Sequence, residues 1–261
     1  MYNSTYMRRR EKFIIISILL GVLLWLTQLS PLNYRYYALM GFSLFTYFAA
    51  AFALKDDLRI KAWLTILPLP ALYSLSISLF YFLLPENFWS KIIILGFFSL
   101  GMYGLFLTGN IFSVSQGRTI QLLQAARNIT LFFSIIISLL GIQIVYSFNL
   151  AYYLNFFAIF LLHFPLTLTN VWSINLDEKL TLTHFQLSFF SSLIISEIAL
   201  ILSFLPIAAW HIALLIMSVF YLILGILQAY LDAKFFKKTI NEYLLLTIFI
   251  LIMFIIFFPG K

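Results

Sequence analysis

The chain contains no cysteine and very little charge. Without cysteine it can form no disulfide, no thiolate nucleophile and no Cys-ligated zinc or iron–sulfur centre. Charged residues make up 10% of the 261 residues, against about 25% in a typical soluble domain. Hydrophobic residues make up 63%, which is more apolar surface than a soluble core of this size can bury. The composition therefore indicates an integral membrane protein.

Nine apolar stretches fill most of the sequence, and a helix needs about 20 apolar residues to cross a bilayer. The predicted spans are 13–29, 36–54, 62–84, 92–114, 129–146, 151–168, 185–205, 211–230 and 243–258. We therefore predict an all-α fold, a polytopic transmembrane bundle of about nine helices. A single membrane domain, 13–258, would follow a basic N-terminus at 1–12 and precede a short tail at 259–261.

Lys and Arg fall almost entirely in every second gap between the spans. With the N-terminus in the cytoplasm, 13 of the 16 basic residues lie inside. Cytoplasmic loops of membrane proteins carry such an excess of positive charge. This pattern predicts a multi-pass protein of the cytoplasmic (inner) membrane, with its N-terminus inside and its C-terminus outside. The net charge of +7 then reflects orientation and contact with membrane lipids, and nucleic acid is not an expected partner.

A short sequence similarity recurs at a spacing of 60 residues. Asn110-Ile-Phe-Ser-Val-Ser115 resembles Asn170-Val-Trp-Ser-Ile-Asn175, and each copy ends a helix predicted to run from outside to inside. One interpretation is a leading helix followed by four repeated two-helix hairpins, in parallel orientation. The alternative is that helix ends in membrane proteins share small, polar and aromatic residues without duplication.

The segment Ser115–Asn128 differs from the other loops. Its apolar residues recur at helical spacing, and Arg118 and Arg127 lie on another face. The pattern predicts either a short amphipathic helix at the membrane surface or an early start to the fifth span. Both arginines are candidates for binding lipid head groups or an anionic substrate. Plain orientation and solvation at the surface is the alternative.

The same region resembles a known pattern. The stretch Thr108–Arg127, with Asn-Ile-Phe-Ser-Val and Arg-Thr-Ile-Gln-Leu-Leu-Gln-Ala-Ala-Arg, is similar to an uncharacterised bacterial family of polytopic membrane proteins. The similarity covers about 20 residues. It implies a shared membrane fold and supplies no catalytic or binding residues.

Glu197 is the polar residue that most needs an explanation, because it falls near the middle of the seventh predicted span. A charge at mid-bilayer costs roughly 2.5–3.5 kcal/mol on insertion scales. We expect Glu197 to face the bundle with a partner, or to be protonated. It is a candidate for coupling a proton or a cation. The alternative is a protonated carboxyl group that ties two helices together by a hydrogen bond.

His163 lies in the sixth predicted span, two residues before Pro165. It is a candidate for relaying protons or pairing with Glu197, and the alternative is a hydrogen bond to a backbone carbonyl. Asn110 and Asn170 end their helices, where capping explains them, unless the repeat makes them a polar pair at a cavity mouth. Asn155 is a further hydrogen-bonding candidate.

Motifs of enzymes are missing from the sequence. There is no His-Glu-x-x-His, no Gly-x-Ser-x-Gly and no phosphate-binding glycine loop. We expect no catalytic residues, no cofactor and no metal. The leading hypothesis is a small carrier or translocator of a lipid-like or small hydrophobic solute. The alternatives are a scaffold or accessory subunit, whose partners would be other membrane subunits or a second copy, and a lipid-modifying enzyme.

Overall fold

The structure is a computed structural model that describes residues 9–55, 60, 62–83, 88–114, 120–177, 179–232 and the single positions 245, 248 and 252. Within these residues every regular element is an α-helix. Eight helical stretches are long and apolar enough to span a membrane. The predicted all-α membrane bundle of about nine helices is therefore confirmed, and its ninth span, 243–258, lies almost wholly outside the described residues.

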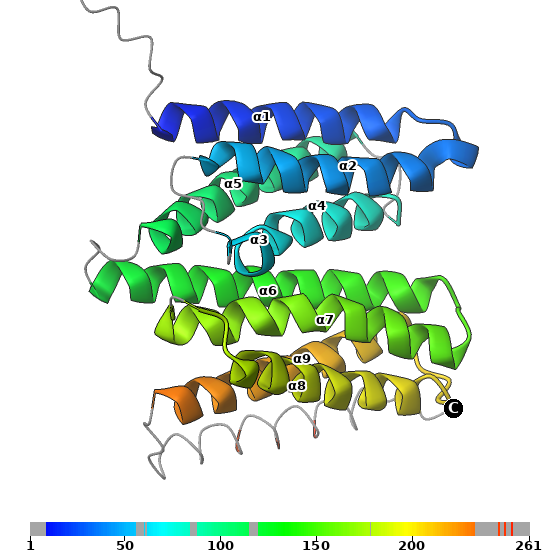
Figure 1. Ribbon diagram of the computed structural model, residues 1–261. Coiled ribbons are helices and arrows are strands. Elements are labelled where there is room, and N and C mark those ends of the chain that lie inside the picture. The colour runs from blue at the N-terminus through cyan, green and yellow to red at the C-terminus, as the bar shows by residue number, and fades with distance from the viewer. Residues whose placement is uncertain are drawn as a thin grey trace, which may run out of the picture. The chain divides into compact units, whose positions relative to one another are not determined.

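The chain divides into two compact units, residues 1–129 and 130–261. In the first, α1 packs against α2 and α5, and α4 packs against the same two helices (Figure 1). The four long helices therefore form a closed ring of neighbours. The helices of this unit are α1 (Arg9–Gln28), α2 (Leu32–Ala53), α3 (Ala62–Thr65), α4 (Pro68–Tyr81) and α5 (Phe88–Ser113).

The predicted third span, 62–84, is broken into α3 and α4. The break falls at Pro68, which is the first residue of α4, and Pro70 is the third residue, still within the first turn of that helix. A proline has no backbone N–H, and its ring clashes with the carbonyl group four residues earlier. Proline is tolerated in the first turn of a helix, so the chain ends α3 at Thr65 and begins a new helix at Pro68.

Aromatic rings fill the core of the first unit. Phe98 of α5 is fully buried and stacks on Tyr73 of α4 with the ring centroids 5.7 Å apart. Phe42 of α2 packs against the same Phe98 ring, with the two ring centroids 5.9 Å apart. The Tyr73 hydroxyl group donates to the carbonyl of Phe97 at 3.0 Å. Ring packing thus joins three of the four long helices.

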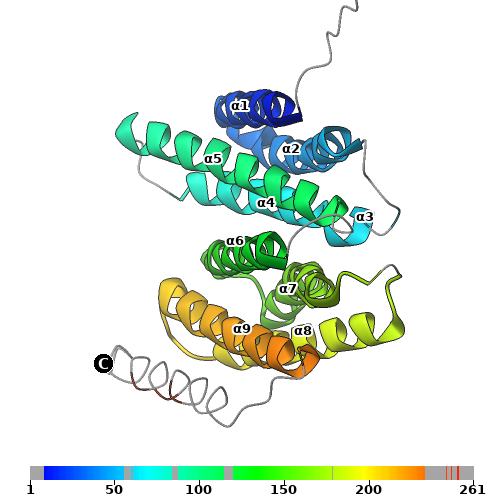
Figure 2. The same ribbon diagram turned by 90° about the vertical axis from the view of Figure 1, so that its left-hand side faces the viewer.

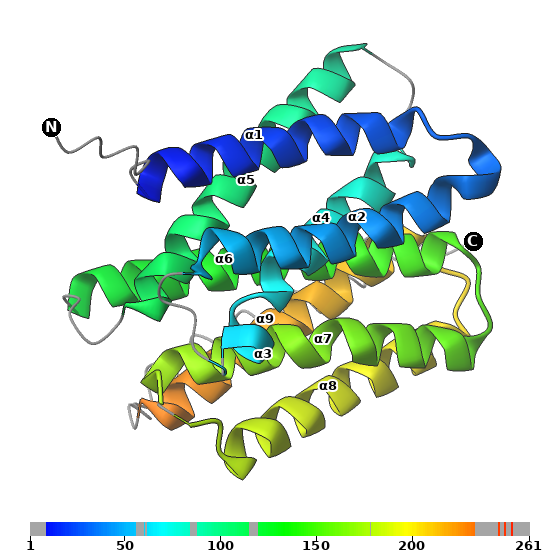
Figure 3. The same cartoon turned by 45° about the horizontal axis from the view of Figure 1, so that its top comes forward.

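In its described residues the second unit contains four long helices. α7 packs along α8, and both contact α9 (Figures 2 and 3). The elements are α6 (Ile120–Ser147), α7 (Tyr152–Asn175), α8 (Leu182–Leu202) and α9 (Ala209–Leu231). α6 begins at Ile120, which corresponds to the early start of the fifth span. The division between the units falls within α6 and so splits the second predicted hairpin, and the repeat of four hairpins stays a prediction.

The distribution of side chains is that of a protein surrounded by lipid. Large apolar residues such as Phe97, Phe157 and Leu161 are exposed. The buried polar residues are mostly Ser and Thr, and many donate to the carbonyl four residues earlier, as Ser192 does to Ser188. Such a hydroxyl group is satisfied within its own helix and can face a tightly packed neighbour.

Candidate functional site

Four buried polar side chains join α6 to α7. The Asn170 side-chain nitrogen donates to Ser134 Oγ at 2.7 Å, and Ser138 Oγ lies 2.9 Å from His163 Nε2. Ser134 and Ser138 lie one turn apart on α6, so both bonds are on the same face of that helix. Each of the four side chains is at most 7% exposed. We call Ser134, Ser138, His163 and Asn170 the polar seam.

His163 has both ring nitrogens engaged. Its Nδ1 lies 2.9 Å from the carbonyl oxygen of Ile159, and since a carbonyl only accepts, Nδ1 carries a hydrogen. In the neutral ring, Nε2 then accepts from the hydroxyl group of Ser138. The imidazole packs edge-on against Phe220 of α9, with centroids 4.8 Å apart. The hydrogen bond to a backbone carbonyl, which was the alternative expected for His163, is therefore formed. Neither ring nitrogen bonds Glu197.

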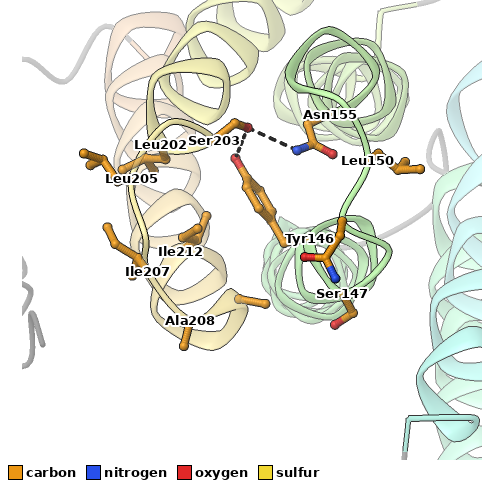
Figure 4. Close-up of a pocket in the computed structure, with 12 residues that line it drawn as sticks. Tyr146, Ser147, Leu150, Asn155, Leu202, Ser203, Leu205, Ile207, Ala208 and Ile212 are labelled. Carbon is orange, nitrogen blue, oxygen red and sulfur yellow. Dashed lines mark hydrogen bonds between the residues drawn. The ribbon is translucent and has the colours of Figure 1, made fainter.

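A pocket of about 410 Å³ lies at one end of the second unit (Figure 4). Its lining residues come from the ends of α6 and α8, from the starts of α7 and α9, and from the loops that connect them. Tyr146 and Asn155 both point toward Ser203: the Tyr146 hydroxyl oxygen lies 3.3 Å from Ser203 Oγ, and Asn155 Nδ2 donates to the same Oγ at 3.1 Å. The lining combines apolar residues, among them Leu202, Ile207 and Ile212, with polar groups that contribute most of its exposed surface.

Asn155 has an unsatisfied side-chain oxygen in this pocket. The residue is 4% exposed, and its Oδ1 has no hydrogen-bond partner. A buried acceptor without a partner costs about 1–3 kcal/mol. Gln143 Oε1 and Thr130 Oγ1 are further buried oxygens without a partner on α6. Of these three, Asn155 is the one that lines the pocket.

Glu197 lies away from both the seam and the pocket. Its side chain is on the exposed face of α8, while its neighbour Ser196 is fully buried. It precedes Leu202, the last residue of α8, by only five positions, or about 8 Å along the axis. A carboxyl group this close to a helix end costs less than one at mid-bilayer. Its coupling role stays a prediction.

The other candidates are distributed over the chain. Asn110 is half-buried on α5 in the first unit, whereas Asn170 belongs to the seam of the second. Arg127 is half-buried on α6, and Arg118 lies outside the described residues. Binding of lipid head groups by these two arginines stays a prediction. The structure thus brings His163 and Asn170 into one seam and places Asn155 in the pocket.

Sequence reasoning missed the partners of these side chains. Ser134 and Ser138 follow Thr130 at intervals of four on α6, and this spacing marks a polar stripe on one helical face. That signal was available in the sequence. Tyr146 and Ser203 carried no such signal, because they are 57 residues apart and meet only when α6 and α8 come together.

No protein family, curated protein or solved structure matches this chain in the comparisons made. The family resemblance over Thr108–Arg127 therefore stays a prediction. Among the described residues, no three His, Cys, Asp or Glu side chains gather where they could hold a metal ion.

Proposed function

We propose that this multi-pass membrane protein binds and carries a lipid-like or small hydrophobic solute, with the pocket of the second unit as its binding site. The observation that carries the proposal is the pocket itself: about 410 Å³, lined by both apolar and polar side chains, with one buried amide oxygen without a partner. Ligand sites are mostly apolar cavities with a few placed polar groups.

The polar seam supports movement of the solute beyond the pocket. Asn155, His163 and Asn170 follow one another along α7 at intervals of eight and seven residues, or steps of about 12 and 10 Å. All three are buried on the inner side of that helix. A solute that moved along α7 would hydrogen-bond His163 and Asn170 by replacing their present partners, Ser138 and Ser134.

The test is translocation in proteoliposomes that contain the full chain. A panel of fluorescent lipids and small hydrophobic solutes is added to one leaflet, and loss of the signal to a membrane-impermeant quencher is followed. Ala208 is an exposed residue that lines the pocket, so Ala208→Trp should fill the pocket and slow translocation of the carried solute about tenfold or more.

Gly96→Trp is the matched control, because a side chain at Gly96 would enter open space on α5. It adds the same ring to the surface without touching the pocket. Translocation of no panel member by the wild-type protein, or equal rates for Ala208→Trp and wild type, would contradict the proposal.

Glu197 favours a second candidate, an accessory subunit of a larger membrane complex. Its carboxyl group is exposed on a helix that contains no other Asp, Glu, Lys or Arg, and a polar or basic side chain of another membrane subunit would bind it there. Native mass spectrometry of the protein released in mild detergent tests this. A stoichiometric second polypeptide that is lost in Glu197→Gln supports the subunit role. If Glu197→Gln instead changes the pH dependence of translocation, the residue couples transport.

A further inference from the structure

We infer that the pocket selects a neutral amphiphile whose head group carries an O–H or N–H donor, which Asn155 Oδ1 accepts. This inference deepens the proposed function and rests on it. It follows from an account of the hydrogen atoms and lone pairs around Tyr146, Asn155 and Ser203, together with the charge and the size of the pocket.

The hydroxyl groups at the polar end of the pocket already donate within the protein. The Tyr146 hydroxyl group donates to the carbonyl of Ala199 at 2.5 Å. Ser203 Oγ lies 3.0 Å from the same carbonyl, four residues back on its own helix. Ser147 donates to the carbonyl of Gln143 at 2.7 Å. These three hydroxyl hydrogens are therefore not available to a ligand.

The orientation of the Asn155 amide follows from the hydroxyl group of Ser203. Because Ser203 donates its hydrogen to the Ala199 carbonyl or to the Tyr146 oxygen, its own oxygen presents a lone pair to Asn155. The amide group must meet that lone pair with its nitrogen, as it does at 3.1 Å, and its oxygen then remains as the unpaired acceptor. A ligand that completes this cluster has to supply a hydrogen.

The charge of the ligand is constrained by what surrounds it. None of the described residues that line the pocket is charged. Burying an ionised head group without a counter-charge costs far more than burying a neutral hydroxyl group that gains a hydrogen bond. The apolar part of the lining, including Leu202 and Ile212, suits hydrocarbon. The recognised chemistry is therefore a neutral donor at one end and an apolar body at the other.

The size of the pocket limits the ligand further. A volume of about 410 Å³ is at the lower end of the roughly 300–1,000 Å³ found for ligand pockets. It suits either a free small alcohol or the hydroxyl head and first carbons of a neutral glycerolipid. Both sources present the same donor to Asn155, so an experiment has to compare them.

The probe is a diazirine-bearing 1-decanoylglycerol, photocrosslinked to the purified full-length protein in detergent. Labelling is read by mass spectrometry on the peptides that contain residues 146–155 and 202–212. The competitors are unlabelled 1-decanoylglycerol, its di-O-methyl ether, 1-decanol and decyl phosphate. We expect the ether and the phosphate to compete about tenfold or more weakly than decanoylglycerol, since each lacks the neutral donor.

Replacement of the acceptor gives a second measurement. Asn155→Leu keeps a similar volume and should lower labelling about tenfold. Asn110→Leu is the matched control, because it makes the same change in the first unit, and it should label like the wild type. The comparison of ether with alcohol uses the wild-type protein alone, so the inference can be tested even if Asn155→Leu does not fold.

Each outcome separates the sources or overturns the inference. Strong competition by 1-decanol identifies a small alcohol, and strong competition by decanoylglycerol alone identifies a glycerolipid head. Equal competition by the ether or the phosphate, unchanged labelling in Asn155→Leu, or no labelling of these peptides overturns the ligand class. The carrier proposal is still supported in that case if Ala208→Trp slows translocation of another panel member, so the two failures are distinguishable.

Discussion

Each of the two units has four long helices in the part of the chain that the structure describes, but the hydrogen bonds between those helices differ. In the first unit, Phe98 packs between aromatic rings of two neighbouring helices. Hydrogen bonds between its helices run from side chains to backbone carbonyls, as from Ser43 to Ala71 and from Tyr73 to Phe97. In the second unit, Tyr146 likewise donates to the Ala199 carbonyl, but further bonds between helices join two side chains, as in Ser134–Asn170 and Ser138–His163.

The difference has a consequence for function. A backbone carbonyl is present at every residue, so a bond to a carbonyl makes little demand on the sequence of the partner helix. A bond between two side chains requires both residues at matching heights and therefore specifies the register of α6 against α7. A polar atom that finds no partner within the protein, such as Asn155 Oδ1, can then bind a ligand. In the proposed function, the second unit therefore supplies the binding site.

The two units also differ at the ends of their helices. Where α2 begins and α4 ends, the Arg35 guanidinium lies 4.3 Å from the centroid of the Phe82 ring. In the second unit, the equivalent end, where α6 and α8 finish, contains the pocket. Both ends are predicted to face the outside. A cation–π contact lies at the first of them, and the second contains the unpaired acceptor of Asn155.

The largest expected effect is on the aromatic core of the first unit. Phe98→Ala should lower the free energy of unfolding by about 3 kcal/mol or more, because it leaves a cavity beside Tyr73. The adjacent Phe97→Ala is the matched control: its side chain is 70% exposed and should change stability little. Unfolding by SDS in mixed micelles measures both. Equal losses would show that ring burial does not hold this unit together.

The next effect tests the close approach of α6 and α7. A Cβ atom at Gly141 would come 2.5 Å from Leu162 Cδ2, so Gly141→Leu should push the helices apart. We expect a loss of about 1–3 kcal/mol and weaker photolabelling of the pocket. Gly96→Leu, on a face with open space, should leave both unchanged. A Gly141→Leu protein with full stability and labelling would separate the pocket from the packing of α6 on α7.

The sequence was sufficient for the fold because the bilayer acts on simple properties of the chain. A run of apolar residues with its backbone groups satisfied internally must be a helix in lipid. Length and hydropathy therefore located the spans that the structure describes. The break at Pro68 was also readable, since proline has a known effect on helices, although the spans were predicted without it.

The site was less predictable, because it depends on which faces of the helices meet. Glu197 is the most prominent polar candidate in the sequence because it is a single charge in an apolar run, yet it lies on the exposed face of α8. Asn155 was a candidate of low specificity, and its importance arises from Ser203, which is 48 residues away in sequence. Such a meeting depends on the rotation of each helix about its axis, which a sequence of almost uniformly apolar residues hardly specifies.

A smaller effect is expected for the seam, where a double-mutant cycle isolates the bond between Ser138 and His163. Such bonds in membrane proteins average about 0.6 kcal/mol and reach about 1.7. Because both side chains are fully buried, we expect a coupling of about 1 kcal/mol between Ser138→Ala and His163→Leu. Ser192→Ala is the control, since Ser192 bonds within α8. Coupling as strong with Ser192 would show that the cycle reports general destabilisation.

The smallest effect concerns the cation–π contact between Arg35 and Phe82 in the first unit. An exposed cation–π contact is worth about 0.5–1 kcal/mol, so a cycle of Arg35→Gln and Phe82→Leu should give about 0.5 kcal/mol of coupling. Lys12 provides the comparison, with its Nζ 4.5 Å from the centroid of the Phe52 ring. Its ammonium group also donates to the Phe52 carbonyl at 2.8 Å, a bond that Phe52→Leu keeps. The Phe52 ring should therefore contribute less to binding Lys12. A larger coupling energy for Lys12 with Phe52 than for Arg35 with Phe82 would contradict this expectation.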